Sequence, residues 1–221
     1  MNNLLALYRS SVGKKIVMSL SGLFLCTFLV VHLSGNFLLF KNDGGVAFDA
    51  YSDFMSTNVV IRTMEIILFS GFIAHSISGG IIWWMNRRAR PEKYRTYKLS
   101  ENTGFASRHT MLTGSIVLVF LVIHLKTFWY GSRFAEVKPS MYQLVSTAFS
   151  SPSYVFFYLV ALVLLGYHLR HGFQSAFQTL GLRSKKYIGL LDAVAVIFWL
   201  IIPMGFASMP VYFLWLNQRI L

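Results

Sequence analysis

Five apolar stretches, each long enough to cross a lipid bilayer, constrain the fold of this chain more than any other feature. A transmembrane helix needs about 20 consecutive apolar residues. Hydrophobic residues make up 55% of the 221 residues and charged residues only 13%, whereas a soluble domain is about 25% charged. We therefore expect an all-α integral membrane protein, a single domain over residues 1–221 with five transmembrane helices. The expected spans are approximately 15–39, 59–85, 108–129, 153–177 and 188–214.

The net charge of +12 is concentrated at the ends of these spans. One set of ends carries 13 lysine and arginine residues and the opposite set carries six, while Arg170 lies inside a span. Positive residues collect on the cytoplasmic side of membrane proteins, so we expect the N-terminus in the cytoplasm and the C-terminus outside. This placement indicates a multi-pass protein in contact with lipids and not with nucleic acid. We expect the membrane to be a bacterial-type inner (cytoplasmic) membrane.

The segments between and at the ends of the spans carry turn and breaker residues. Gly181 predicts a C-terminal helix cap for the fourth span. Pro203, Gly205 and Pro210 predict kinks in the fifth span, because proline removes a backbone donor and clashes with the preceding turn. Residues 42–58 and 131–152 are expected to be external loops.

Four histidines lie inside the first four spans, and ionisable residues at membrane depth mark functional sites. The rise of about 1.5 Å per residue gives their depths. His32 and His124 share a level nearer the outside, and His75 and His168 share a level nearer the cytoplasm. The sequence therefore predicts two histidine pairs at two depths.

The spacing of these histidines repeats along the chain. His32 precedes His124 by 92 positions, and His75 precedes His168 by 93. Spans one and three each have a glycine ten positions before the histidine, and spans two and four each have one four positions after it. In chain order these glycines are Gly22, Gly79, Gly114 and Gly172. The pattern indicates a duplicated helical hairpin.

In an up-down four-helix bundle the parallel helices lie on diagonals, so each pair would face across the bundle at one depth. Haem iron accepts one axial ligand on each face of the ring, and imidazole is a common choice. We therefore expect the first four helices to form a haem-binding bundle with two haem b groups. Attachment would be non-covalent, because the single Cys26 forms no C-x-x-C-H motif.

Other roles for these histidines remain open. A membrane histidine can simply be a hydrogen-bonding contact between helices. Zinc prefers tetrahedral clusters of nitrogen and sulfur ligands, and two histidines per level without cysteine or carboxylate fit it poorly. His171, three residues after His168, is expected either to contact a haem propionate or to face the inner interface. His109 lies near the cytoplasmic edge and is expected to have no role beyond the interface.

Five strings around these positions carry a resemblance to a known family. They are HLSGNFLLF from His32, FDAYSDFM in the first external segment, EIILFSGFIAHSISGG around His75, IHLKTFW at His124 and YHLRHGFQSAFQTLGL at His168. With them, the whole chain resembles the membrane anchor of succinate dehydrogenase and quinol:fumarate reductase, namely its single-chain, five-helix, two-haem cytochrome b subunit. The resemblance implies that His75 and His168 bind the proximal haem, and that His32 and His124 bind the distal haem.

The resemblance also implies partners and a function. The partners would be a flavoprotein subunit and an iron–sulfur subunit on the cytoplasmic side, since this chain has no dinucleotide fingerprint and no cysteine cluster. The chain would be the electron-transport subunit of a respiratory complex II, a succinate:quinone oxidoreductase linked to the tricarboxylic acid cycle. Dicarboxylate chemistry would lie on the partners, and we expect the quinone to be menaquinone. Some members have a glutamate just before the fourth histidine as a proton route; Gly166 and Tyr167 here argue against that route.

Glu65 is the one acidic residue expected well inside a span, near the depth of the outer histidine pair. A buried carboxylate there could exchange protons with quinone. Alternatively it pairs with Arg62, three residues earlier on the same helix face.

Two other functions use the same residues. One is a self-contained two-haem cytochrome b that reduces an external acceptor without a dehydrogenase partner. The other is a transporter in which the intramembrane histidines relay protons, and this alternative predicts no visible absorption. Flavin and iron–sulfur signals that accompany the purified chain, or their absence, separate the first alternative from a complex II anchor.

Overall fold

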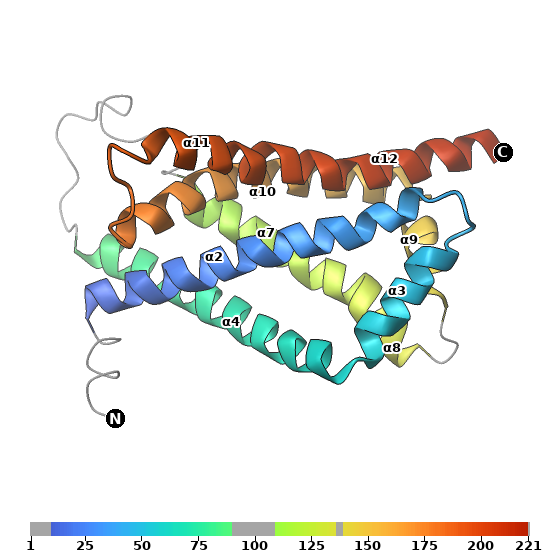
Figure 1. The fold of residues 1–221 in the computed structure, drawn as a ribbon, viewed down its shortest axis with the longest axis horizontal. Coiled ribbons are helices and arrows are strands. Elements are labelled where there is room, and N and C mark those ends of the chain that lie inside the picture. The colour runs from blue at the N-terminus through green and yellow to red at the C-terminus, as the bar shows by residue number, and fades with distance from the viewer. Residues whose placement is uncertain (1–9, 90–108, 136–138, 221) are drawn as a thin grey trace.

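The computed structural model describes residues 10–89, 109–135 and 139–220. These residues are almost entirely helical and contain no strand. Five helical segments are long and apolar enough to cross a membrane, and each overlaps one expected span (Figure 1). They are Ser11–Phe40, Val59–Arg88, Thr110–Phe134, Pro152–Thr179 and Ile188–Leu216. The prediction of an all-α, five-helix membrane protein is confirmed.

Three of the five spans are built from more than one kind of helix. The first joins α2 to a short 3₁₀ segment, and the third and fifth contain π-helical turns. In chain order the span elements are α2 (Ser11–Asn36), η1 (Phe37–Phe40), α4 (Val59–Arg88), α7 (Thr110–His124), η2 (Leu125–Tyr130), α8 (Gly131–Phe134), α10 (Pro152–Thr179), α11 (Ile188–Val196), η3 (Ile197–Ile201) and α12 (Ile202–Ile220).

The first four spans form a bundle in which α2 packs along α4 and α10, and α10 packs along α7. Helices α4 and α7 touch only sparsely, and the strong contacts run around the ring of four rather than across it. Helices α2 and α7 therefore lie on one diagonal, and α4 and α10 on the other, as expected. The fifth span lies outside this ring against α10 and α2 (Figure 1).

The helix ends follow from side chains that satisfy exposed backbone groups. The Ser10 hydroxyl accepts a hydrogen bond from the Gly13 amide at 2.9 Å, and the Asn58 side chain accepts one from the Val60 amide at 3.0 Å. At the far end of α10, Gly181 has φ +73°, and the next amide, that of Leu182, bonds back into the helix. This is the glycine cap predicted for the fourth span.

The two expected external loops contain helices, so that expectation is wrong in detail. Residues 46–57 form α3 (Val46–Thr57), and residues 141–148 form α9 (Met141–Ala148). The Tyr142 amide donates to the Asp49 carboxylate at 2.8 Å, which joins the two helices over the outer end of the bundle. Sequence reasoning missed them because a helix that covers a bundle end needs no 20-residue apolar run.

The fifth span contains a π-helical turn, Ile197–Ile201, just before Pro203. Proline cannot donate a hydrogen bond to the carbonyl one turn earlier, which belongs to Trp199. That carbonyl lies against Gly166 of α10, where the Cβ of any other residue would stand 2.7 Å from it. Gly166 therefore allows close contact between the fourth and fifth spans, and the expected kink takes the form of a π-helical turn.

The half of the bundle that contains His32 and His124, called the outer half below, has the larger buried core. Its core cluster gathers buried side chains from seven elements, including Leu33, Phe128, Phe149, Tyr158 and Phe213. The inner half has a smaller cluster around Cys26, Leu169, Phe173 and Ala195. The two predicted histidine levels thus lie in differently packed surroundings.

Candidate cofactor sites at two histidine pairs

The four intramembrane histidines meet in the two pairs predicted from their depths. The ring centroids of His32 and His124 lie 5.9 Å apart, with an interplanar angle of 87°. The ring centroids of His75 and His168 lie 6.2 Å apart, with an angle of 84°. Each pair crosses one diagonal of the bundle, and we call them the outer pair and the inner pair.

This spacing fits a metal ion held between two imidazoles. A metal bonded to one nitrogen of each ring at about 2 Å would hold the two ring centroids roughly 6 Å apart. Both pairs match this value. Two imidazole rings in direct hydrogen-bonded contact could also have this centroid distance. The hydrogen-bond partners of the ring nitrogens help to distinguish the two arrangements.

Three of these four rings have a polar neighbour at Nδ1, and Nδ1 of His168 is buried without a hydrogen-bond partner. Nδ1 of His124 lies 2.5 Å from the Tyr158 hydroxyl, and Nδ1 of His75 lies 3.2 Å from the Met18 carbonyl. At His32 the neighbour of Nδ1 is the side-chain nitrogen of Asn36 at 3.4 Å, which can only donate, so this contact does not fix the ring proton on Nδ1. Metal-bound histidines commonly carry a second contact of this kind, which fixes the ring and its tautomer. At His75 and His124 these contacts suit a ring proton on Nδ1, which leaves Nε2 of those two rings for a ligand bond.

Two glycines make room for the rings of the inner pair. A Cβ atom on Gly22 of α2 would lie 3.1 Å from Cε1 of His75, and one on Gly114 of α7 would lie 3.0 Å from Cε1 of His168. These glycines occupy equivalent places in the proposed duplicated hairpin. Each lies on the helix of an outer histidine but contacts an inner one, a relation that the sequence spacing alone did not predict.

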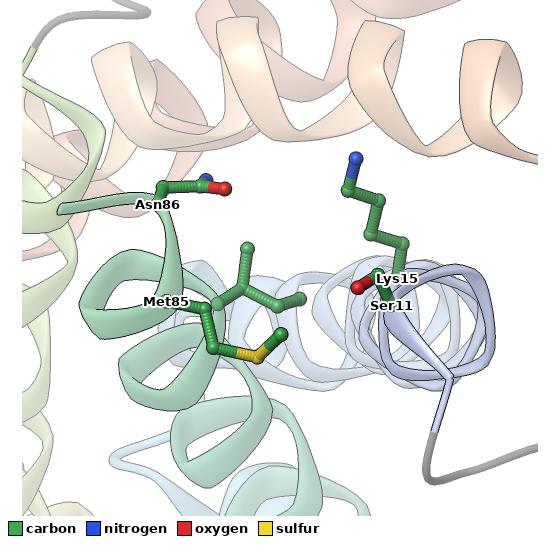
Figure 2. A pocket seen from close by; sticks show the side chains of 5 residues that line it. Ser11, Lys15, Met85 and Asn86 are labelled. Atoms are coloured by element: carbon green, nitrogen blue, oxygen red, sulfur yellow. The ribbon is translucent and has the colours of Figure 1, made fainter. Parts of the chain in front are cut away.

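The inner half also contains space that side chains leave open. A Cβ on Gly79, one turn beyond His75, or on Gly172, one turn beyond His168, would meet no atom within 4 Å. Further toward the inner end, α2 and α4 enclose a pocket of about 220 Å³. Figure 2 shows Lys15 of α2 reaching over the same space as Asn86 of α4. This pocket lies at the inner end of α2 and α4, and no histidine is among its lining residues.

Aromatic side chains surround the outer pair. The Phe28 ring stacks on His32 at 5.2 Å, and Phe128 packs against His124 at the same distance. Phe206 from the fifth span lies 5.5 Å from His32. The outer pair therefore lies in a largely apolar, low-dielectric environment.

Glu65 is held by three side chains rather than left free. Its carboxylate pairs with Arg62 at 2.6 Å and with Arg133 at 3.0 Å, and it accepts a hydrogen bond from the Trp129 indole at 2.6 Å. We call these four residues the Glu65 cluster. The cluster joins α4 to η2 and α8, the segment that directly follows His124. The expected ion pair with Arg62 is therefore present, while proton exchange with quinone stays a prediction.

Several other predicted residues lie apart from the pairs. His171 is half-buried on α10, three residues beyond His168, and His109 stands at the N-terminal cap of α7. The guanidinium of Arg170 lies over the Trp199 ring at 5.2 Å, and the side chain is exposed on the bundle surface. None of these three belongs to either pair.

Sequence reasoning missed Tyr158 as a partner of the outer pair. Tyrosine is common in apolar spans, so its presence gave no signal. The position of Tyr158 did give a signal: it stands ten residues before His168, as Glu65 stands ten residues before His75.

Among the described residues, no group of three or more histidine, cysteine or acidic side chains is arranged to hold a metal ion.

Comparison with protein-family models finds no match for this chain, and comparison with curated proteins and with solved structures finds none either.

Proposed function

We propose that this protein is the two-haem cytochrome b anchor of a succinate:quinone oxidoreductase. The observation that carries the proposal is the pair of histidine contacts across both bundle diagonals, at 5.9 and 6.2 Å. His32 and His124 would hold the distal haem b, and His75 and His168 the proximal one. Four histidines that served only as helix contacts would need no such matched, nearly perpendicular pairs.

The chain's residues position the haems, which when bound would carry single electrons between an iron–sulfur partner and membrane quinone. Met18 and Tyr158 fix the rings of His75 and His124, and Gly22 and Gly114 keep space for the inner rings. The aromatic side chains around the outer pair exclude water. Lys15 and Asn86 place polar groups at the inner end of the bundle.

The partner surface is expected at the inner end, on the side of the proximal pair. Arg87 and Arg88 end α4, stacked over Trp83 and Trp84 with their guanidinium carbons 5.6 and 4.0 Å from the ring centroids. Lys185 and Lys186 are exposed in the connection that follows α10. The basic stretch 90–98, also expected in this surface, lies outside the described residues.

Reversing charges at this end should weaken assembly with the flavoprotein and iron–sulfur subunits. The test replaces Arg87, Arg88, Lys185 and Lys186 by glutamate and measures flavin and iron that co-purify with the chain at low and high salt. Charges beyond about 8 Å are screened at physiological ionic strength, so the loss should depend on salt. Lys126→Glu at the outer half is the control. A full complement of partner subunits in the quadruple variant at both salt concentrations would refute this surface.

Glu65→Gln should slow quinone-linked turnover by roughly 10²-fold, the usual contribution of a general acid or base. Glutamine keeps the shape of the side chain but cannot exchange a proton. Both haems should remain, and electron transfer to an artificial dye should be preserved. The comparison of quinone-linked and dye-linked rates on one preparation measures the effect.

Arg62→Gln is the matched control for that experiment. It removes one partner of Glu65 but leaves the carboxylate bound to Arg133 and Trp129, so quinone-linked turnover should stay near the wild-type rate. If the Glu65 cluster is only a structural clamp, Glu65→Gln will lower thermal stability modestly and leave turnover intact. That result would exclude the proton-exchange role.

The second candidate is a stand-alone two-haem cytochrome b, and the same histidine geometry supports it. It predicts haem without accompanying flavin or iron–sulfur signals when the protein is purified from its native membrane under mild conditions.

A further inference from the structure

Tyr158 is the buried polar side chain that touches the outer pair. Only 7% of its surface is exposed, and its hydroxyl lies 2.5 Å from Nδ1 of His124. Three rings hold it in place: those of Phe120 at 4.8 Å, Phe149 at 4.9 Å and Tyr154 at 5.3 Å. Such packing leaves the phenol little rotational freedom, so its contact with His124 is built into the core.

Each histidine ring has a different Nδ1 environment. His75 faces the backbone carbonyl of Met18, and His32 lies near the side-chain amide of Asn36 on its own helix. Of the described histidines, His124 is the one whose Nδ1 faces a phenol. The two members of the outer pair are therefore unequal, although the helices that carry them are equivalent by sequence spacing.

The position ten residues before the inner histidine carries different side chains in the second and fourth spans. Glu65 and Tyr158 both stand ten residues before an inner histidine. Glu65 faces Arg133 and Trp129, whereas Tyr158 faces His124. One hairpin thus uses this position for an ion-pair cluster, and the other uses it to contact a histidine of the outer pair.

We propose that Tyr158 is a positioning residue that fixes the ring of His124 and thereby sets the potential of the outer haem apart from that of the inner one. The inference rests on the proposed function. With Nε2 of His124 on iron, the remaining proton of the neutral imidazole is on Nδ1, which then donates to the Tyr158 oxygen. An acceptor at that atom raises the basicity of the ligand. A more basic ligand favours ferric over ferrous iron, so Tyr158 lowers the potential of one haem.

Tyr158→Phe removes the acceptor and keeps the ring. We expect both haems to remain in the pyridine haemochrome assay. In a redox titration of the intact complex, followed by absorption, one of the two midpoint potentials should shift upward and the other should stay in place. The low-spin ferric signal of the same haem should change in electron paramagnetic resonance, which a change in overall stability would not produce.

Two further variants keep the test decisive. Tyr212→Phe alters a tyrosine of the fifth span whose ring packs against Phe40 at 5.1 Å and Phe213 at 5.4 Å rather than against a histidine, so neither potential should move. Tyr158→Gln offers an amide oxygen as acceptor and should shift the potential less than Tyr158→Phe, or restore the outer haem if the phenylalanine variant loses it. Unchanged potentials in Tyr158→Phe, or identical behaviour of Phe and Gln, would overturn the role of Tyr158. A wild-type protein without haem would overturn the proposed function instead.

Discussion

Alanine at His75 or His168 is expected to remove one haem and leave the other, and alanine at His32 or His124 is expected to remove the second one instead. Under the proposed function each substitution would delete a haem ligand from one pair, while the other pair lies one level away in the bundle. The haem content measured by the pyridine haemochrome assay should fall from two haems per chain to one. Variants of the two pairs should lose different components of the redox titration.

His171→Ala is the control for these substitutions. It removes an imidazole from the same helix as His168 but from neither pair, so both haems should remain ligated. Loss of both haems in all four alanine variants, with folding preserved by circular dichroism, would contradict independent pairs.

Valine at Gly114 is expected to remove the inner haem and to spare the outer one, even though Gly114 shares α7 with the outer ligand His124. The reason is geometric: a Cβ at Gly114 would lie 3.0 Å from Cε1 of His168. The extra methyl groups of valine would push that ring out of line with His75. Gly22→Val should act in the same way through His75, where the corresponding distance is 3.1 Å.

The control for the glycine substitutions is Gly189→Val on α11, where an added Cβ meets no atom within 4 Å. It should keep both haems. Redox titration of each variant identifies the component that is lost, with the His168→Ala and His124→Ala variants as standards. Loss of the outer component in Gly114→Val would show that the effect spreads along α7 instead of across the bundle to His168.

The spans and the pairing of the histidines could be predicted because both depend on long-range regularities of the chain. Apolar length defines a membrane helix, and a constant rise per residue converts sequence position into depth. Because parallel helices lie on the diagonals of the bundle, His32 faces His124 and His75 faces His168.

The details around the pairs could not be predicted in the same way. The contact of Tyr158 with His124 depends on side-chain packing, and the role of Gly114 depends on which neighbouring helix approaches it. A helix can accommodate Pro203 either by bending or by shifting its hydrogen-bond register, and the π-helical turn is the second of these. Helix α3 lies in a polar segment whose composition is equally typical of a loop. These features depend on tertiary contacts that no single stretch of sequence encodes.

The haem content of the purified wild-type protein tests the central claim most directly. The protein is extracted in mild detergent, its visible spectrum is recorded in oxidised and dithionite-reduced forms, and haem is counted by the pyridine haemochrome assay against protein mass. We predict the reduced α-band of a b-type cytochrome and two haems per chain, both extractable by acidified solvent because no covalent link holds them. A colourless protein, or one that binds a single haem per chain, would contradict the two-haem bundle.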